Sequence, residues 1–263
     1  MCELLGINSG APVDTAPYLK EFFSHSVRHP HGWGIMRDIS GRRVVFKESV
    51  SAKESGVLED IIKGTEPQTD LLAHIRLATV GGMKNENSHP FTAADLSGRV
   101  WTFIHNGTIY SGTALMNYIA CQKGDTDSER VFLYLMDEVN SAIKKDGELS
   151  ERRRFEIVDR LVCTLSPRNK LNLIIFDGEV LYVHKNMTNT LSYKRLENGY
   201  VFSTVPLDDG DWRDFPLACL AAYKGGKLIY EGTRHGGVDH RRCADGRRDP
   251  GGFRGRRPDA PDP

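Results

Sequence analysis

The feature that most constrains this chain stands at its start. There, Cys2 is separated by a single residue from an apolar segment, residues 4–7, that is typical of a short β-strand. A cysteine is small, so the methionine before it can be removed. One residue would then carry both a thiol nucleophile and a free α-amine, which titrates at about pH 8 and can accept the thiol proton. Position alone favours a small buried cysteine at a strand start, but the motifs further along the chain favour the nucleophile.

The charges of the chain are balanced, with 35 Lys and Arg against 35 Asp and Glu, which does not indicate a nucleic-acid partner. Its 263 residues allow one large domain or two small ones, with a substantial core. No apolar run is long enough to span a membrane, and no signal peptide begins the chain. The five cysteines are scattered and odd in number, which predicts free thiols in a reducing, cytoplasmic compartment rather than a disulfide framework.

Hydrophobic periodicity predicts the order of the elements. Apolar residues at helical spacing predict helices over residues 16–27, 53–63, 113–121, 131–143 and 151–165. Alternating or short apolar runs predict strands over residues 4–7, 33–36, 43–46, 71–76, 101–105, 171–176, 180–184, 190–193, 200–204, 218–223 and 227–230. Turn signals lie at residues 8–12, 40–41, 177–178 and 225–226. Strands and helices come first and mainly strands follow, which favours a layered α+β fold with antiparallel sheets over a doubly wound parallel sheet.

Polar residues at the ends of two predicted strands are candidates for a site. The strand over residues 71–76 finishes His74-Ile75-Arg76, which delivers both polar side chains to the edge of a sheet. The strand over residues 101–105 stops at Asn106-Gly107, a strong hairpin signal. The short segment that follows makes a tight hairpin less convincing. The alternative is that the Asn106 amide and the Gly107 backbone N–H face one developing oxyanion.

Two further groups of polar residues have structural interpretations. Asp127 or Ser128 can cap the long helix that follows, which leaves a second acidic residue in that segment for other work. His25, His29 and His31 lie close together in the sequence, but no carboxylate or cysteine joins them at metal-ligand spacing. A loop with incidental histidines is therefore favoured over a metal site.

The composition changes near residue 233. Residues 233–263 are dominated by Arg, Gly, Asp and Pro, and they contain too little apolar surface to fold. This predicts a folded domain over residues 1–232 and a disordered tail over residues 233–263. The arginines of the tail could favour RNA or an anionic surface, but the interspersed aspartates weaken that interpretation.

Six stretches of the chain, considered together, are more specific than any residue alone. In chain order they are Cys2-Glu3-Leu4-Leu5-Gly6, His31-Gly32-Trp33-Gly34-Ile35, Ala73-His74-Ile75-Arg76-Leu77-Ala78-Thr79, Ser88-His89-Pro90-Phe91, His105-Asn106-Gly107 and Thr126-Asp127-Ser128-Glu129. With these stretches the sequence resembles the class II glutamine amidotransferases, which are N-terminal-nucleophile hydrolases, and its similarity to their free-standing YafJ-like branch is close. The resemblance covers the first half of the chain, and the later predicted strands fit the fold without carrying a motif.

The resemblance implies a catalytic site and a substrate. Cys2 would attack the side-chain amide of glutamine through a thioester, with its own α-amine as general base and then general acid. Asn106 and Gly107 would form the oxyanion hole. Arg76 would bind the α-carboxylate of the substrate, Asp127 its α-ammonium group, and Thr79 would line the same pocket.

The resemblance also implies an architecture and a set of partners. The expected fold is a four-layer αββα sandwich of two antiparallel sheets, of the N-terminal-nucleophile hydrolase type, and no cofactor or metal is implied. Relatives with a fused synthase domain often have Trp and His where this chain has Leu77 and Val80, so contacts tied to closure of the site are expected to differ. Ammonia would pass to a separate partner protein. Two alternatives stay open: hydrolysis of another γ-glutamyl amide or peptide, and a non-catalytic glutamine-binding subunit. The oligomeric state does not follow from the sequence.

Overall fold

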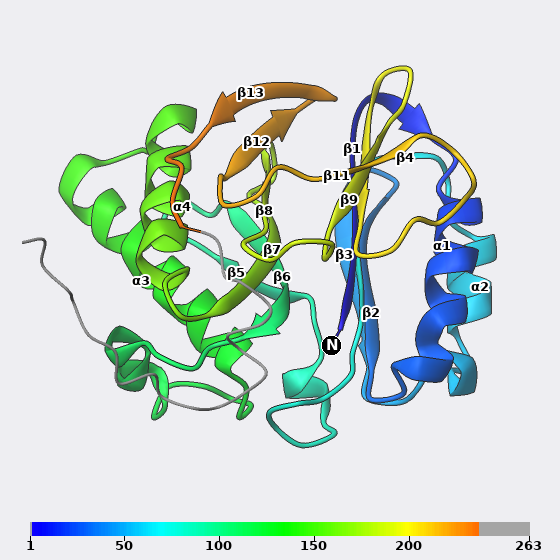
Figure 1. Cartoon of the computed structure of the whole chain (residues 1–263), viewed down its shortest axis with the longest axis horizontal. Coiled ribbons are helices and arrows are strands. Elements are labelled where there is room, and N and C mark those ends of the chain that lie inside the picture. Colours follow the sequence, from blue (N-terminus) through cyan, green and yellow to red (C-terminus); the bar gives the residue numbers. More distant parts are fainter. Residues whose placement is uncertain (1, 237–263) are drawn as a thin grey trace, which may run out of the picture.

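A computed structural model describes residues 2–236 of the chain. Two antiparallel β-sheets pack face to face, and helices cover the outer face of each sheet, so that the molecule has four layers in the order helix, sheet, sheet, helix (Figure 1). The predicted α+β sandwich is therefore confirmed. The predicted boundary at residue 233 lies near the end of the described part, and residues 237–263 of the predicted tail lie outside it.

The first sheet has seven strands in the order β11-β9-β10-β1-β4-β2-β3. Its strands are β1 (Glu3–Val13), β2 (Trp33–Ile39), β3 (Arg42–Glu48), β4 (Gln68–Ile75), β9 (Ser192–Arg195), β10 (Gly199–Ser203) and β11 (Trp212–Asp214). The strand that follows Cys2 is central, because β1 pairs with β4 on one side and with β10 on the other. Cys2 is thus attached to one of the best-supported strands of the sheet.

The second sheet has six strands in the order β13-β12-β8-β7-β6-β5. They are β5 (Phe91–Ala94), β6 (Val100–Thr108), β7 (Lys170–Phe176), β8 (Leu181–His184), β12 (Ala221–Lys224) and β13 (Lys227–Glu231). The expected turns at 177–178 and 225–226 connect β7 to β8 and β12 to β13, and the turn at 40–41 connects β2 to β3. In the last of these turns Ser40 and Gly41 both have positive φ, as a two-residue hairpin turn requires.

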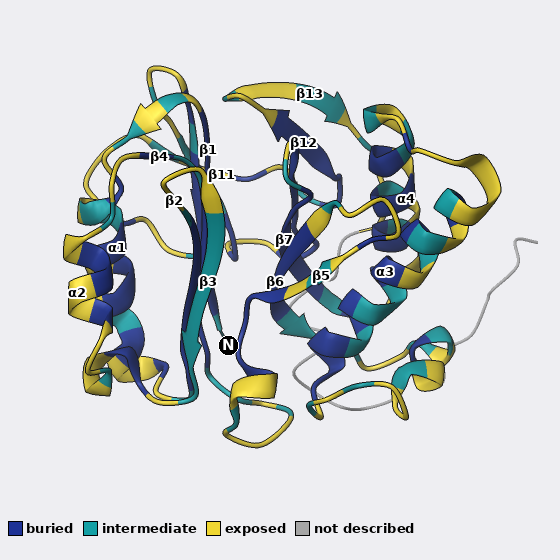
Figure 2. Ribbon diagram, turned by 180° about the vertical axis from the view of Figure 1, so that it is seen from behind, coloured by how far each residue is buried: buried dark blue, intermediate teal, exposed yellow. Residues whose placement is uncertain are grey.

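Helices shield the outer faces of the sheets (Figure 1). The first sheet is covered by α1 (Ala16–Ser24) and α2 (Leu58–Lys63), with short 3₁₀ segments at His25–Arg28 and Ala52–Glu54. The second sheet is covered by α3 (Asp127–Asp146) and α4 (Glu151–Leu165). Further 3₁₀ turns lie at Asn85–Asn87 and at Thr113–Tyr118, where an α-helix was expected. Figure 2 shows the helices buried toward the sheets and exposed on their outer sides.

The space between the sheets is filled by apolar side chains that alternate along the strands. Leu4 of β1, Leu72 of β4, and Ile104 of β6 belong to this inter-sheet core, which also contains Met36, Ile174, Phe176, Leu181, Val183, Leu191, Phe202, Phe215, Ala221 and Tyr223. Side chains two residues apart on a strand share a face. Cys2, Arg76 and Asn106 therefore belong to the inner faces, beyond the apolar core and at one end of the sandwich.

One predicted turn and one turn signal that was doubted prove to be strand. β1 continues through residues 8–12, because Asn8 and Ser9 pair with Tyr200 and Gly199 of β10, and an irregularity before Val13 absorbs the turn residues. β6 continues through Asn106 and Gly107, which pair with Asn172 and Leu171 of β7, so Asn106-Gly107 is not a hairpin turn. In both places a partner strand supplied by a distant part of the chain overrides the local turn preference.

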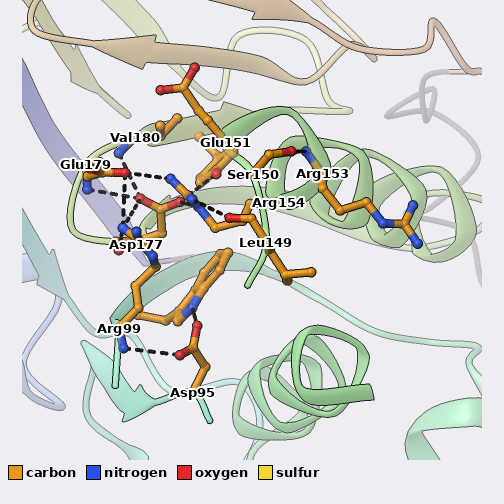
Figure 3. A network of polar contacts seen from close by, with 12 residues as sticks. Asp95, Arg99, Leu149, Ser150, Glu151, Arg153, Arg154, Asp177, Glu179 and Val180 are labelled. Carbon is orange, nitrogen blue, oxygen red and sulfur yellow. Dashed lines mark hydrogen bonds and ion pairs between the residues drawn. The ribbon is translucent and has the colours of Figure 1, made fainter. Parts of the chain in front are cut away.

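A buried ion pair joins α4 to the second sheet at the end opposite Asn106. The Nε of Arg154 donates to the carboxylate of Asp177 over 2.6 Å (Figure 3). The hydroxyl of Tyr182 donates to the same carboxylate over 2.7 Å. Arg154 also donates to Glu179 and to the carbonyl of Leu149. These contacts compensate the burial of both charges.

Among residues 2–236, no helix is both long and apolar enough to cross a membrane.

Candidate active site

Cys2 directly precedes β1 and is partly buried. Its thiol lies 3.6 Å from the carbonyl oxygen of Leu77, which follows β4, so the thiol proton points toward that oxygen. Burial is the main influence and raises the pKa of the thiol, while the contact with Leu77 and the charge of Arg76 lower it and the charge of Asp127 raises it. At neutral pH Cys2 is therefore a thiol that needs a base before it can act as a nucleophile.

Arg76 is the first residue after β4, and its side chain is buried. Its backbone is fixed on both sides, since its N–H donates to Gly32 and its carbonyl accepts from His31. Its guanidinium donates to the carbonyls of Val80, Gly81 and Gly82, which folds the following loop around it. A guanidinium has five N–H donors, so two stay available for a ligand. Burial lowers the pKa of Arg76, and the charge of Asp127 opposes that change.

Asn106 lies near the end of β6 and is 1% exposed. Within the described residues, neither the nitrogen nor the oxygen of its side-chain amide has a hydrogen-bond partner, although both atoms are buried. A buried polar group left without a partner costs about 1–3 kcal/mol. Its backbone, by contrast, is well held, because the side chain of Asn172 donates to the Asn106 carbonyl over 3.1 Å. Asn106 therefore presents an unused amide on a rigid strand.

Gly107 follows Asn106 where space is too restricted for any other residue. A Cβ atom at this position would collide with the carbonyl of Lys170 and with the ring of His105. The His105 ring is itself fixed, with Nδ1 2.9 Å from the hydroxyl of Ser128 and Nε2 3.2 Å from the Lys170 carbonyl. Burial lowers the pKa of His105, which keeps the imidazole neutral at pH 7. The backbone at Gly107 thus stays unobstructed by a side chain of its own.

Asp127 is the first residue of α3 and is buried. Its carboxylate accepts the N–H of Ile109 over 2.7 Å and that of Ser128 over 2.9 Å. It is not the helix cap, and neither is Ser128: Thr126 caps α3, by accepting the N–H of Glu129 in its side-chain oxygen. The prediction that Asp127 or Ser128 is the cap was therefore wrong. The residue directly before the helix, which has extended backbone and caps it, is Thr126.

The structure brings most of the predicted residues together. The charges of Arg76 and Asp127 both act on the Cys2 thiol, and Asn106 lies on the facing sheet at the same end of the sandwich. Thr79 lies in the exposed part of the loop that Arg76 organises, and it is the predicted site residue with the least enclosure.

Several polar contacts around this site were not predicted. Glu3, next to Cys2, is buried and accepts a hydrogen bond from His25 over 2.8 Å, and His29 lies 3.7 Å from the same carboxylate. Asp125, next to the cap, accepts from Asn87 and from the backbone of Gly82 and so holds the loop from the other side. The signal for Glu3 was a charged residue directly before an apolar segment, but the sequence cannot show which histidines approach its carboxylate.

Known proteins share both the sequence and the fold. A family model described as glutamine amidotransferases class-II matches residues 1–213. A protein of Methanocaldococcus jannaschii, named as uncharacterized, is 30% identical over 264 residues, which cover 89% of this chain and 72% of that protein. YafJ of Escherichia coli is 29% identical over 189 residues, which cover 70% of this chain and 72% of YafJ.

Among solved structures, the glutamine phosphoribosylpyrophosphate amidotransferase of Bacillus subtilis superposes with a TM-score of 0.63 and 16% identity, covering 87% of this chain and 48% of that one. At this identity the likeness shows the fold. The two sandwiched sheets are therefore arranged as in that amidotransferase, and the family model extends over the whole site, from Cys2 to Asp127. This chain belongs to the class II glutamine amidotransferases.

Proposed function

We propose that this protein releases ammonia from the side chain of glutamine, with Cys2 as the nucleophile. The thiolate attacks the amide carbon, the C–N bond breaks, and the leaving nitrogen departs as ammonia after it takes up a proton. A thioester between Cys2 and the glutamyl group is left, and water hydrolyses it to glutamate. Removal of Met1 would give the α-amine that accepts the thiol proton and returns it to the leaving nitrogen.

The observation that carries this proposal is the unpartnered amide of Asn106. Its Nδ2 group is buried without a hydrogen-bond acceptor among the described residues. A buried donor that is left unused costs stability unless a ligand or transition state takes it up. A donor of this kind, next to the unobstructed backbone of Gly107, suits the negatively charged oxygen of a tetrahedral intermediate.

The charges near Cys2 suit the amino-acid end of the substrate. We propose that the remaining N–H donors of Arg76 bind the α-carboxylate, that Asp127 binds the α-ammonium group, and that Thr79 lines the same pocket. Arg76 and Asp127 are buried or nearly so, which strengthens their interaction with the opposite charges of a ligand. A glutamyl group held in this way presents its δ-carbon to the nucleophile.

The first experiment is the intact mass of the purified protein before and after treatment with a glutamine-mimicking diazoketone. The expected result is a protein without Met1 that gains a single adduct, which Cys2→Ala abolishes. A matched control is Cys121→Ala, since Cys121 is exposed and its replacement should leave the adduct unchanged. Wild-type protein with free Cys2 that gains no adduct and releases no ammonia from glutamine would overturn the proposal.

The identity of the leaving amine is a separate question, because Arg76 and Asp127 contact only the glutamyl end. Comparing glutamine with γ-glutamyl amides and peptides of larger leaving groups decides it. A preference of more than about tenfold in kcat/KM for a larger γ-glutamyl compound would assign the protein as a γ-glutamyl hydrolase. A preference for glutamine favours release of ammonia to an acceptor protein in the cytoplasm.

A further inference from the structure

Arg76 and Asn106 belong to different sheets, and one buried side chain bridges the strands that carry them. His74 lies on β4, two residues before Arg76 and opposite Leu4 of β1, and it is fully buried. Its Nε2 lies 3.3 Å from the carbonyl oxygen of His105, the residue directly before Asn106 on β6. The contact therefore connects the two sheets at the peptide unit that leads into the proposed oxyanion hole.

The carbonyl of His105 lies where β6 loses a neighbouring strand. On one side β6 pairs with β7 as far as Thr108, but on the other its pairing with β5 ends at Phe91 and Phe103. Beyond Phe103 the β5 side of the ladder is unpaired. A buried backbone carbonyl needs a donor, and the His74 side chain supplies one from the facing sheet.

The protonation of His74 follows from its partner and its surroundings. A carbonyl only accepts, so Nε2 must carry the proton. Burial lowers the pKa of His74 to about 3, so the ring is neutral at physiological pH and its Nδ1 has no proton. The ring of His89 packs against this ring at a tilt of 35°, with centroids 4.1 Å apart, and its pKa is lowered well below the usual value, also by burial. The close ring of His89 restricts rotation of His74 without competing for the His105 carbonyl.

We infer that His74 is a positioning residue that holds the Asn106–Gly107 segment in register with Cys2 and Arg76, through the hydrogen bond from its Nε2 to the His105 carbonyl. The inference rests on the proposed function, because only that function makes Asn106 and Gly107 donors to an oxyanion. Arg76 is anchored independently, by Gly32, by His31 and by the loop carbonyls. Loss of the bond should therefore displace the oxyanion donors and leave the glutamyl-binding groups in place.

Two substitutions at this position separate the hydrogen bond from the packing. His74→Gln places an amide N–H at about the position of Nε2, and His74→Leu fills similar space without a donor. Tyr182→Phe is the matched control. Like His74, Tyr182 is fully buried, but it lies on the second sheet, and the substitution removes one hydrogen bond from its side chain. This hydrogen bond lies far from the proposed oxyanion hole. Its acceptor, Asp177, follows Phe176, which pairs with Thr102 of β6. Thr102 is four residues from Asn106 along the strand, which corresponds to about 13 Å.

The expected kinetic result is a lower kcat with little change in KM. His74→Leu should lower kcat for ammonia release about 10- to 100-fold, a part of the 10²–10³ that a full oxyanion donor typically contributes, with KM within about threefold. His74→Gln should restore kcat to within about threefold of the wild type, and Tyr182→Phe should leave both parameters unchanged. Equal losses in the Leu and Gln variants, or a loss confined to KM, would overturn the inference.

Amide hydrogen exchange gives a second result that does not depend on activity. Exchange over residues 104–108 should be faster in His74→Leu than in the wild type and in His74→Gln, while exchange over the 171–176 strand changes little. If the wild type releases no ammonia but this difference is present, the proposed function fails and the bridging role stands. If the wild type is active and exchange over 104–108 is the same in all variants, the bridging role fails alone.

Discussion

At the scale of single residues, the site combines charged groups that several hydrogen bonds hold in place with a buried amide that has none. Arg76 and Asp127 both make several hydrogen bonds to the backbone, so their orientation is determined before any ligand arrives. Asn106 differs, because its buried amide has no partner among the described residues. A group that lowers stability in the resting protein and lies at the end of the inter-sheet core is best explained by what it does in the transition state.

This contrast predicts opposite effects of Asn106→Ala on activity and on stability. The substitution removes one oxyanion donor, so kcat for ammonia release should fall by about 10²–10³ with KM changed little. It also removes an unpartnered buried amide, so the melting temperature should stay the same or rise. Steady-state kinetics and thermal unfolding on one preparation measure both. A kcat within threefold of wild type, or a large drop in melting temperature, would contradict the assignment.

At the scale of elements, the sequence predicted most helices and strands but not where a few of them end. The hairpin between β2 and β3 and the strand that contains His74 and ends before Arg76 follow from local patterns that the tertiary structure reinforces. The Asn106-Gly107 turn signal failed because β7, more than sixty residues later, pairs through both residues. Contacts between distant segments also explain what was missed at the site. The site residues lie in motifs and could be proposed from a resemblance, whereas the contacts of Glu3 with His25 and of His74 with His105 join distant segments and have no signal in the sequence.

The N-terminus of α3 couples an element to the site, which leads to a prediction for Thr126→Ala. Loss of this cap should lower the free energy of unfolding by about 1 kcal/mol. Because the carboxylate of the next residue, Asp127, is proposed to bind the α-ammonium group, KM for glutamine should rise several-fold. Ser150→Ala is the matched control, since Ser150 caps α4 in the same way and lies away from the site. A similar rise of KM in both variants would indicate general destabilisation.

At the scale of the whole molecule, two kinds of buried polar group lie in the sandwich. At one end, Arg154 and Asp177 are charged and paired, and the positive charge of Arg154 is further stabilised, because interactions with Asp177 and Tyr182 outweigh its burial and raise its pKa. Elsewhere, four buried histidines, one of them His105, are kept neutral by burial, which lowers the pKa of each. His74 and His89 pack against each other between the sheets near the site, and His184 donates from Nδ1 to the carbonyl of Leu171.

These histidines predict that the protein loses stability in mild acid. In the unfolded chain a histidine takes up a proton near pH 6.5, whereas folded His74 and His184 do so only at about pH 3. Between these values the unfolded state binds more protons, so each of the two should remove about 1.4 kcal/mol of stability per pH unit below about pH 6. Urea unfolding at pH 7.5, 5.5 and 4.5 measures the slope. His184→Gln should reduce it by about one proton, and His74→Gln by about one more in the double variant, whereas Lys63→Gln, at an exposed site, should not. A slope that is identical in all four proteins would mean that these rings already carry protons in the folded state.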